Sequence, residues 1–179
     1  MDNIFGLALI ALGLIVAFNL LLTLALIKKT SILPNPTTPS NSPLPVGSAA
    51  PTFLAETTDG GAYSLSDFVG RKLILVFVSP TCNPCLMKMP ELIRLRSSLL
   101  KKNISLVITS IASMEQTRQL IHQFEIDFPI LIAPRGENSL VENYAVYATP
   151  TFCSISEDGK IEGGGELNSE WTTLVSALE

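Results

Sequence analysis

An uncharged, apolar run of residues near the N-terminus limits most strongly how this chain can fold. No charged residue occurs between Asp2 and Lys28, and almost every side chain from Ile4 to Ile27 is apolar. As a helix, residues 4–27 would rise about 36 Å, which exceeds the roughly 30 Å hydrocarbon core of a bilayer. We therefore predict one transmembrane helix at 4–27 that anchors the chain in a lipid bilayer.

A cleaved signal peptide and a buried helix of a soluble protein are the alternatives for this run. A signal peptide has a basic start and an apolar region of about 7–15 residues. Here the apolar run is longer, and it follows the sequence Met-Asp-Asn. A helix packed on a soluble core would show a polar face, and the run has none. The uncleaved anchor fits these observations best.

Residues 28–45 are predicted to form a linker. Six prolines occur between Thr30 and Pro51 among Ser, Thr and Asn residues. This composition is typical of an extended, semi-rigid tether. Residues 46–179 remain for a folded domain, and this length is sufficient to bury a hydrophobic core.

The charge of the domain excludes several classes of function. The chain has 12 Lys and Arg residues against 16 Asp and Glu residues, and without Asp2, Lys28 and Lys29 the numbers are 10 and 15. An acidic domain without a basic stripe predicts no binding of nucleic acid and no docking on anionic lipid. The 47% hydrophobic content excludes disorder, and three cysteines are too few for a disulfide-stapled miniprotein.

Strands and helices alternate along the domain. Short, continuous apolar runs predict buried strands at 72–78 and 104–109, with a helix at 83–100 between them. The other predicted elements are helices at 113–124, at 137–145 and from residue 168 or 169, and strands at 129–132, 151–156 and 160–164. This order indicates an α/β fold with a mainly parallel sheet, to which the last hairpin adds an antiparallel edge.

Cys82 and Cys85 directly follow the first buried strand and begin the first helix of the domain. A thiol at a helix N-terminus meets the helix dipole and free backbone N–H groups, which favour the thiolate and lower its pKa. Two intervening residues let both sulfurs meet within one helical turn. We therefore expect an exposed Cys82 to attack a disulfide and a covered Cys85 to resolve the product.

Zinc binding, haem attachment and a purely structural disulfide are the other roles of such a pair. Zinc needs further ligands, and only Cys153 and His122 remain, without metal-site spacing. Haem attachment needs a histidine directly after Cys85, where Leu86 stands. A structural disulfide would close too short a loop to stabilise the chain much. We expect no metal and no cofactor, because the dithiol itself carries two electrons.

Several motifs around the cysteine pair match a known family. Val46–Phe53 fits the opening G-x-x-A-P-x-F, Leu75–Cys85 fits an active-site strand and turn, and Pro90 fits a proline that kinks the following helix. Over residues 46–179 the chain resembles the membrane-anchored, thioredoxin-like thiol–disulfide oxidoreductases of the redoxin group, which includes ResA and TlpA. Within this group it is most similar to the methylamine-utilisation MauD-type proteins.

The resemblance implies a thioredoxin fold, with a central mixed sheet flanked by helices, and disulfide exchange with protein partners. Thr149 and Pro150 match the segment in which a cis-proline lies beside the sulfurs and binds the extended chain of the substrate. Thr81, Asn83 and Pro84 are the active-site neighbours. Thr81 replaces a usual tryptophan, whereas Pro84 matches the reducing members, because the strongly oxidising members carry histidine there. We expect a reductant or isomerase.

The resemblance also predicts partners. They are a disulfide-containing protein substrate, such as an exported enzyme under maturation, and a membrane thiol protein that donates electrons.

Where many thioredoxins have a buried aspartate that assists proton transfer, this chain has Val76. Cys153 is expected to be a small buried hydrophobe.

Two alternative functions stay open. One is a non-catalytic thioredoxin-fold binding or chaperone module in which the cysteines are idle. The other is a thiol peroxidase, but the peroxidatic motif needs proline and threonine where Leu75 and Ser79 stand. Substituting Cys82 separates catalysis from binding, and a peroxide consumption assay tests the second alternative.

Two features disagree on the side of the membrane that holds the domain. Lys28 and Lys29 place it in the cytoplasm under the positive-inside rule. The resemblance implies a single-pass protein of the cell membrane with an extracytoplasmic, periplasmic domain, and disulfide exchange is commonest outside the cytosol. We take the extracytoplasmic location as the expectation.

Overall fold

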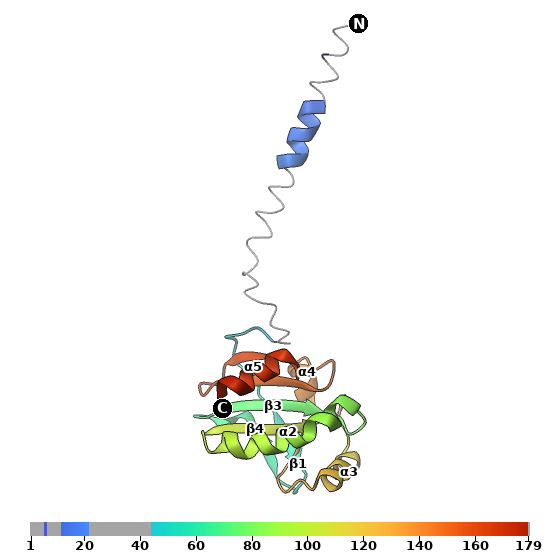
Figure 1. Ribbon diagram of the computed structural model, residues 1–179, viewed down its shortest axis with the longest axis vertical. Helices are drawn as coiled ribbons and strands as arrows, with labels where there is room; N and C mark the ends of the chain where they lie inside the picture. The colour runs from blue at the N-terminus through green and yellow to red at the C-terminus, as the bar shows by residue number, and fades with distance from the viewer. Residues whose placement is uncertain (1–5, 7–11, 22–43, 179) are drawn as a thin grey trace. The chain divides into compact units, whose positions relative to one another are not determined.

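The computed structural model describes Gly6 and residues 12–21 and 44–178, and it divides the chain into the units Met1–Pro39 and Ser40–Glu179 (Figure 1). In the first unit, residues 12–21 are helical. Among all these residues, no helix combines the length and apolar character needed to cross a bilayer. Most of the predicted anchor at 4–27, and the predicted linker as far as residue 43, lie outside the described residues.

A mixed sheet of seven strands forms the centre of the second unit. The strands are β1 (Leu54–Thr57), β2 (Ala62–Ser64), β3 (Lys72–Val78), β4 (Ile104–Ser110), β5 (Leu131–Ile132), β6 (Thr151–Ile155) and β7 (Ile161–Glu166). Their order in the sheet is β2-β1-β5-β4-β3-β6-β7. The pairs β3–β4 and β4–β5 are parallel, and the other pairs are antiparallel.

Helices cover both faces of this sheet. They are η1 (Leu65–Phe68, a 3₁₀ turn), α2 (Asn83–Leu100), α3 (Met114–Phe124), α4 (Ser139–Asn143) and α5 (Ser169–Leu178). Residues of α2, α3 and α5 belong to the hydrophobic cluster on one face, and residues of η1 and α4 belong to the cluster on the other. Figure 1 shows α2 lying along β3 and β4.

Strand β3 contributes to both clusters. Ile74, Val76 and Val78 pack towards α2 and α5, whereas Leu73, Leu75 and Phe77 pack towards η1 and α4. All six side chains are buried. A strand that is covered on both faces needs apolar residues at every position, which explains the continuous apolar run in the sequence.

The structure confirms most of the predicted elements and corrects the predicted sheet. It adds β1, β2 and η1, which the sequence did not reveal because these elements are short and because β1 exposes Leu54 and buries Thr57, which hides the alternation of apolar and polar residues. The prediction of a mainly parallel sheet is wrong. The predicted antiparallel hairpin at the edge is confirmed: β6 pairs antiparallel with β3, and β7 forms the edge of the sheet. All five residues of β6 are buried, as an interior position requires.

Trp171 connects α5 to α2 and β6. Its side chain is fully buried, and its ring lies edge-on to Phe152 with 5.3 Å between the ring centroids. Its indole Nε1–H donates a hydrogen bond to Oε1 of Glu91 over 2.8 Å. The tryptophan therefore contributes both apolar burial and a satisfied polar contact.

We predict that Trp171→Ala lowers the free energy of unfolding by about 3–5 kcal/mol, because the substitution leaves a large cavity in the core. Urea unfolding of the full-length chain measures this loss. Ser176→Ala, on the exposed face of the same helix, is the matched control and is expected to change the free energy by less than about 0.5 kcal/mol. A loss below about 1 kcal/mol for Trp171→Ala would contradict the prediction.

Cys153 lies in β6 and is fully buried, as expected for a small hydrophobe. Burial raises the pKa of its thiol to about 12. At pH 8 only about one molecule in ten thousand would then hold the reactive thiolate. The position of this thiol in the core, together with its pKa, indicates an inert residue.

We therefore expect iodoacetamide at pH 8 to modify Cys82 of the reduced, folded chain and to leave Cys153 unmodified. Mass spectrometry of the proteolysed product identifies the modified residues, and the same reaction in urea is the control in which all three cysteines react. Modification of Cys153 in the folded chain at a rate similar to that of Cys82 would refute its inert character.

Candidate functional site

The cysteine pair lies where β3 ends and α2 begins. The backbone N–H of Cys82 donates to the carbonyl of Ser79 over 3.1 Å, which closes the turn between the two elements. Cys82 is the N-cap residue of α2, with extended backbone angles, and Pro84 occupies the first turn of the helix. Proline is favoured there because the first N–H groups of a helix have no partner within the helix.

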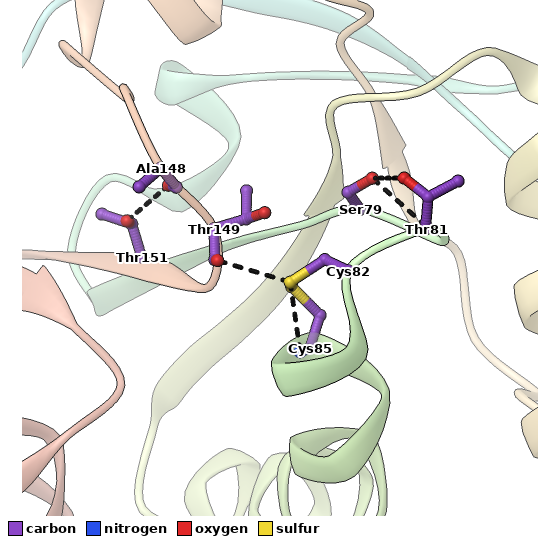
Figure 2. Close-up of a disulfide and its surroundings, with 7 residues drawn as sticks. All are labelled: Ser79, Thr81, Cys82, Cys85, Ala148, Thr149 and Thr151. Carbon is purple, nitrogen blue, oxygen red and sulfur yellow. Dashed lines mark hydrogen bonds between the residues drawn. A yellow bond between two sulfur atoms is a disulfide. The ribbon is translucent and has the colours of Figure 1, made fainter.

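Cys82 and Cys85 form a disulfide, with 5.2 Å between their Cα atoms (Figure 2). Sγ of Cys82 also accepts a hydrogen bond from the backbone N–H of Cys85 over 3.3 Å. Cys85 is 1% exposed, whereas Cys82 keeps partial exposure. Cys82 therefore has the more accessible sulfur of the two. This sulfur lies at the N-terminus of α2, where the positive end of the helix dipole favours the thiolate once the disulfide is reduced.

A distant segment lies directly against the sulfur of Cys82. The peptide bond between Thr149 and Pro150 is cis, and the carbonyl oxygen of Thr149 lies 3.3 Å from Sγ of Cys82. The hydroxyl of Thr151 donates to the carbonyl of Ala148 over 2.7 Å (Figure 2). This hydrogen bond joins the two residues that flank the cis peptide bond. Residues 67 positions apart in sequence therefore meet at the redox sulfur.

The three predicted neighbours lie on the rim of the site. Thr81, Asn83 and Pro84 are exposed. The hydroxyl of Thr81 lies 3.0 Å from the hydroxyl of Ser79, and its backbone N–H donates to the same oxygen over 3.4 Å. Ser79 was not among the predicted site residues. Its hydroxyl supports the turn that presents Cys82.

A groove of about 530 Å³ lies beside the disulfide. Three segments form its walls: the first two turns of α2, the cis-proline segment, and the connection from β7 to α5. Its lining residues are Pro84, Met87, Lys88, Glu91, Ala148, Thr149, Pro150, Glu166, Leu167 and Asn168. The groove therefore brings the predicted pair Thr149 and Pro150 next to charged residues that the sequence analysis did not single out.

Lys88 and Glu91 form an ion pair within this groove, with 2.9 Å between Nζ and Oε2. Partial burial raises the pKa of Glu91, but the hydrogen bonds from Lys88 and Trp171 outweigh it, so its pKa lies below the ordinary value. The carboxylate is therefore ionised at neutral pH. Opposite charges three residues apart on a predicted helix were the signal that could have revealed this pair.

Val76 and Cys85 belong to the same buried hydrophobic cluster. The buried side of Cys85 therefore lies among apolar side chains, and Val76 brings no ionisable group to it. Among residues 6, 12–21 and 44–178, no three His, Cys, Asp or Glu side chains lie close enough together to hold a metal ion. The disulfide of Cys82 and Cys85, with its more accessible sulfur at the N-terminus of α2, is suited to thiol–disulfide exchange.

Comparisons with known proteins give the same result. The AhpC/TSA family matches residues 46–163. The thioredoxin-like protein YneN of Bacillus subtilis is 32% identical over 65% of this chain and 68% of its own length. The thiol-disulfide oxidoreductase ResA of Oceanobacillus iheyensis is 31% identical over 65% of this chain and 62% of its own length.

A solved structure shows the same fold. The exposed lipoprotein thioredoxin of Streptococcus pneumoniae superposes with a TM-score of 0.60 at 23% identity, over 72% of this chain and 98% of that chain. This likeness confirms the predicted thioredoxin fold with its mixed central sheet. The chain belongs to the AhpC/TSA family, and with its Cys82–Cys85 pair it is a thiol–disulfide oxidoreductase.

Proposed function

We propose that this chain reduces or isomerises disulfides of partner proteins, with Cys82 as the nucleophile and Cys85 as the resolving thiol. The observation that carries the proposal is the position of Sγ of Cys82. It lies at the N-terminus of α2, accepts the N–H of Cys85, and faces the carbonyl of Thr149 at the head of the groove. An extended partner chain in the groove would bring its disulfide to this sulfur.

The reaction proceeds in two exchanges. The thiolate of reduced Cys82 attacks one sulfur of the partner's disulfide, so that a mixed disulfide forms, the partner's S–S bond breaks, and the leaving sulfur takes up a proton. Cys85 then loses its proton and attacks Sγ of Cys82. The Cys82–Cys85 bond forms, the mixed disulfide breaks, and the second partner thiol leaves. Two electrons pass from the chain to the partner.

Each cycle leaves the chain oxidised, so an electron donor must restore the dithiol. In our proposal a membrane thiol protein supplies the two electrons. The reducing direction is supported by Pro84, because the strongly oxidising relatives that the chain resembles carry a histidine at this position. The neutral proline offers no charge that would stabilise the reduced thiolate further.

The proposal includes a location. Residues 4–27 anchor the chain in the cell membrane, and residues 46–179 lie on its extracytoplasmic side. The length of the apolar run supports the anchor, and the description of the pneumococcal thioredoxin as an exposed lipoprotein supports the side. The partner is then an exported, disulfide-containing enzyme during its maturation, as the resemblance to the MauD-type proteins implies.

We predict that Cys82→Ser abolishes the reduction of insulin disulfides by the full-length chain, because no other accessible thiol can begin the exchange. Cys85→Ser is expected to accumulate a mixed disulfide between Cys82 and the substrate, because the resolving thiol is missing. Turbidity of the precipitating insulin chains follows the first reaction, and non-reducing gels with mass spectrometry follow the second.

Cys153→Ser is the matched control for these variants and is expected to retain the wild-type rate. A Cys82→Ser chain that still reduces insulin would overturn the assignment of the nucleophile. A chain that binds partners equally well with and without Cys82, and that never forms the mixed disulfide, would instead be a binding module.

The direction of electron flow has its own test. We expect the full-length chain, equilibrated with glutathione, to show a potential near the thioredoxin value of about −270 mV. Pro84→His is expected to raise the potential by at least about 30 mV, because a histidine at this position stabilises the reduced thiolate. A wild-type potential near about −120 mV would identify an oxidant and contradict the proposed direction.

A further inference from the structure

A second cavity, of about 400 Å³, lies at the end of the sheet away from the disulfide. Arg71 directly precedes β3 and Ser105 is the second residue of β4, so the cavity lies where these parallel strands begin. Cys82 follows the opposite end of β3. Seven residues of strand separate the two ends by about 20 Å. The cavity is therefore distinct from the redox site and its groove.

The lining of this cavity combines two arginines with apolar walls. Besides Arg71, Arg96 and Ser105, it consists of Ala62, Tyr63, Asp67, Phe68, Leu100, Leu106, Val107 and Pro129. The residues come from β2, η1, α2 and β4 and from the segment before β5. A hollow that joins apolar walls to a few convergent polar groups has the character of a small-molecule site.

Arg96 supplies a positive charge that no protein acid neutralises by contact. Its Cζ lies 4.1 Å from the centre of the Phe128 ring, which holds the guanidinium in place. In the described part of the chain, no carboxylate lies within ion-pair distance of Arg96, and its side chain makes no hydrogen bond. Its planar fork of N–H donors is therefore available to an anion from solution.

Arg71 adds a second guanidinium. One of its N–H groups donates to the backbone carbonyl of Asp67 over 2.8 Å, and its Cζ lies 5.7 Å from the centre of the Phe68 ring. The carboxylate of Asp67 accepts both the N–H and the hydroxyl of Ser64, at 2.7 and 2.8 Å. Asp67 offsets part of the charge of Arg71, but the remaining N–H donors of Arg71 stay free for a ligand.

Ser105 completes the polar part of the lining. Its side chain is only 7% exposed, and among the described residues its hydroxyl has no hydrogen-bond partner. The oxygen of this hydroxyl keeps contact with solvent, because among the described residues the only buried side-chain oxygen or nitrogen without a partner is the hydroxyl oxygen of Thr109. The Ser105 hydroxyl can therefore donate to a ligand that displaces this solvent. Two guanidinium groups and this hydroxyl thus offer donors to one ligand.

We propose that this cavity binds a small organic anion, whose carboxylate or phosphate group is held by Arg96, Arg71 and Ser105. The apolar body of the ligand packs on the wall formed by Tyr63, Phe68 and Val107, which belong to or pack against the same hydrophobic cluster. This site is additional to the proposed thiol–disulfide exchange and uses none of its residues. The whole chain has a net charge of −4, so its overall electrostatic field does not attract anions. The cavity would therefore select an anion through the local contacts of its two arginines.

Titration calorimetry of the full-length chain tests the proposal with phenyl phosphate, benzoate and inorganic phosphate as anionic probes and benzyl alcohol as the neutral probe. We expect saturable binding of at least one of the two aromatic anions and none of benzyl alcohol. The better of the two identifies the preferred head group. An aromatic phosphate that binds no more tightly than inorganic phosphate would overturn the assignment of the apolar wall.

Arg96→Gln is expected to weaken the binding of the aromatic anion at least about tenfold, because it removes charge-assisted hydrogen bonds. Arg94→Gln is the matched control: this exposed arginine lies on the same helix, donates to the carbonyl of Pro90, and lies outside the cavity. The control is expected to bind within twofold of the wild type. Equal affinities of the two variants would refute the site, as would the absence of saturable binding to the wild type.

Arg71→Gln is expected to weaken the binding of the aromatic anion as well. The urea unfolding midpoints of the Arg96, Arg94 and Arg71 variants show whether each variant is folded. Insulin reduction by Arg96→Gln is expected to match the wild type, because the cavity lies at the other end of the sheet. A parallel loss of disulfide reduction in a folded variant would overturn the independence of the two sites.

Discussion

The burial of β3 on both faces is the constraint on which the rest of the structure depends. Six successive apolar side chains are divided between two hydrophobic clusters, so the strand must lie in the interior of the sheet. Its last residue, Val78, is thereby fixed, and the turn from Ser79 to Cys82 starts from a rigid point. The accessible sulfur lies on a short turn between a buried strand and a helix, which is the kind of rigid support that keeps a reactive group in position.

The pairing of β3 with β6 brings the other half of the site into place. Phe77 lies opposite Thr151 and Val76 lies opposite Phe152. Because Thr149 and Pro150 immediately precede Thr151, the antiparallel register carries the carbonyl of Thr149 to the end of β3 where Cys82 begins α2. A shift of one residue in this register would turn every side chain of β6 to the other face of the sheet. The packing of Phe152 against Trp171 and the burial of Cys153 in the opposite cluster both oppose such a shift.

The sequence was most informative where one local pattern determines the structure. Apolar runs predicted β3 and β4, and the spacing of Cys82 and Cys85 predicted a disulfide within the first helical turn. The resemblance supplied Thr149 and Pro150. The sequence did not reveal the β1–β2 hairpin, the antiparallel pairing of β1 with β5, or most of the residues that line the groove. Strand direction and groove lining arise from contacts between segments far apart in the chain, and a single sequence shows no spacing that records them.

The charges in the groove follow from the packing of the core. The buried indole of Trp171 requires an acceptor, and Glu91 provides one oxygen for it while the other oxygen binds Lys88. Loss of the indole donor would raise the pKa of Glu91, because the hydrogen bond from Trp171 is one of the contacts that lower it. A change at Trp171 therefore alters both the stability of the core and the electrostatics of the groove beside the disulfide. A change at Lys88, which lies at the surface of the groove, alters the electrostatics with little effect on the core.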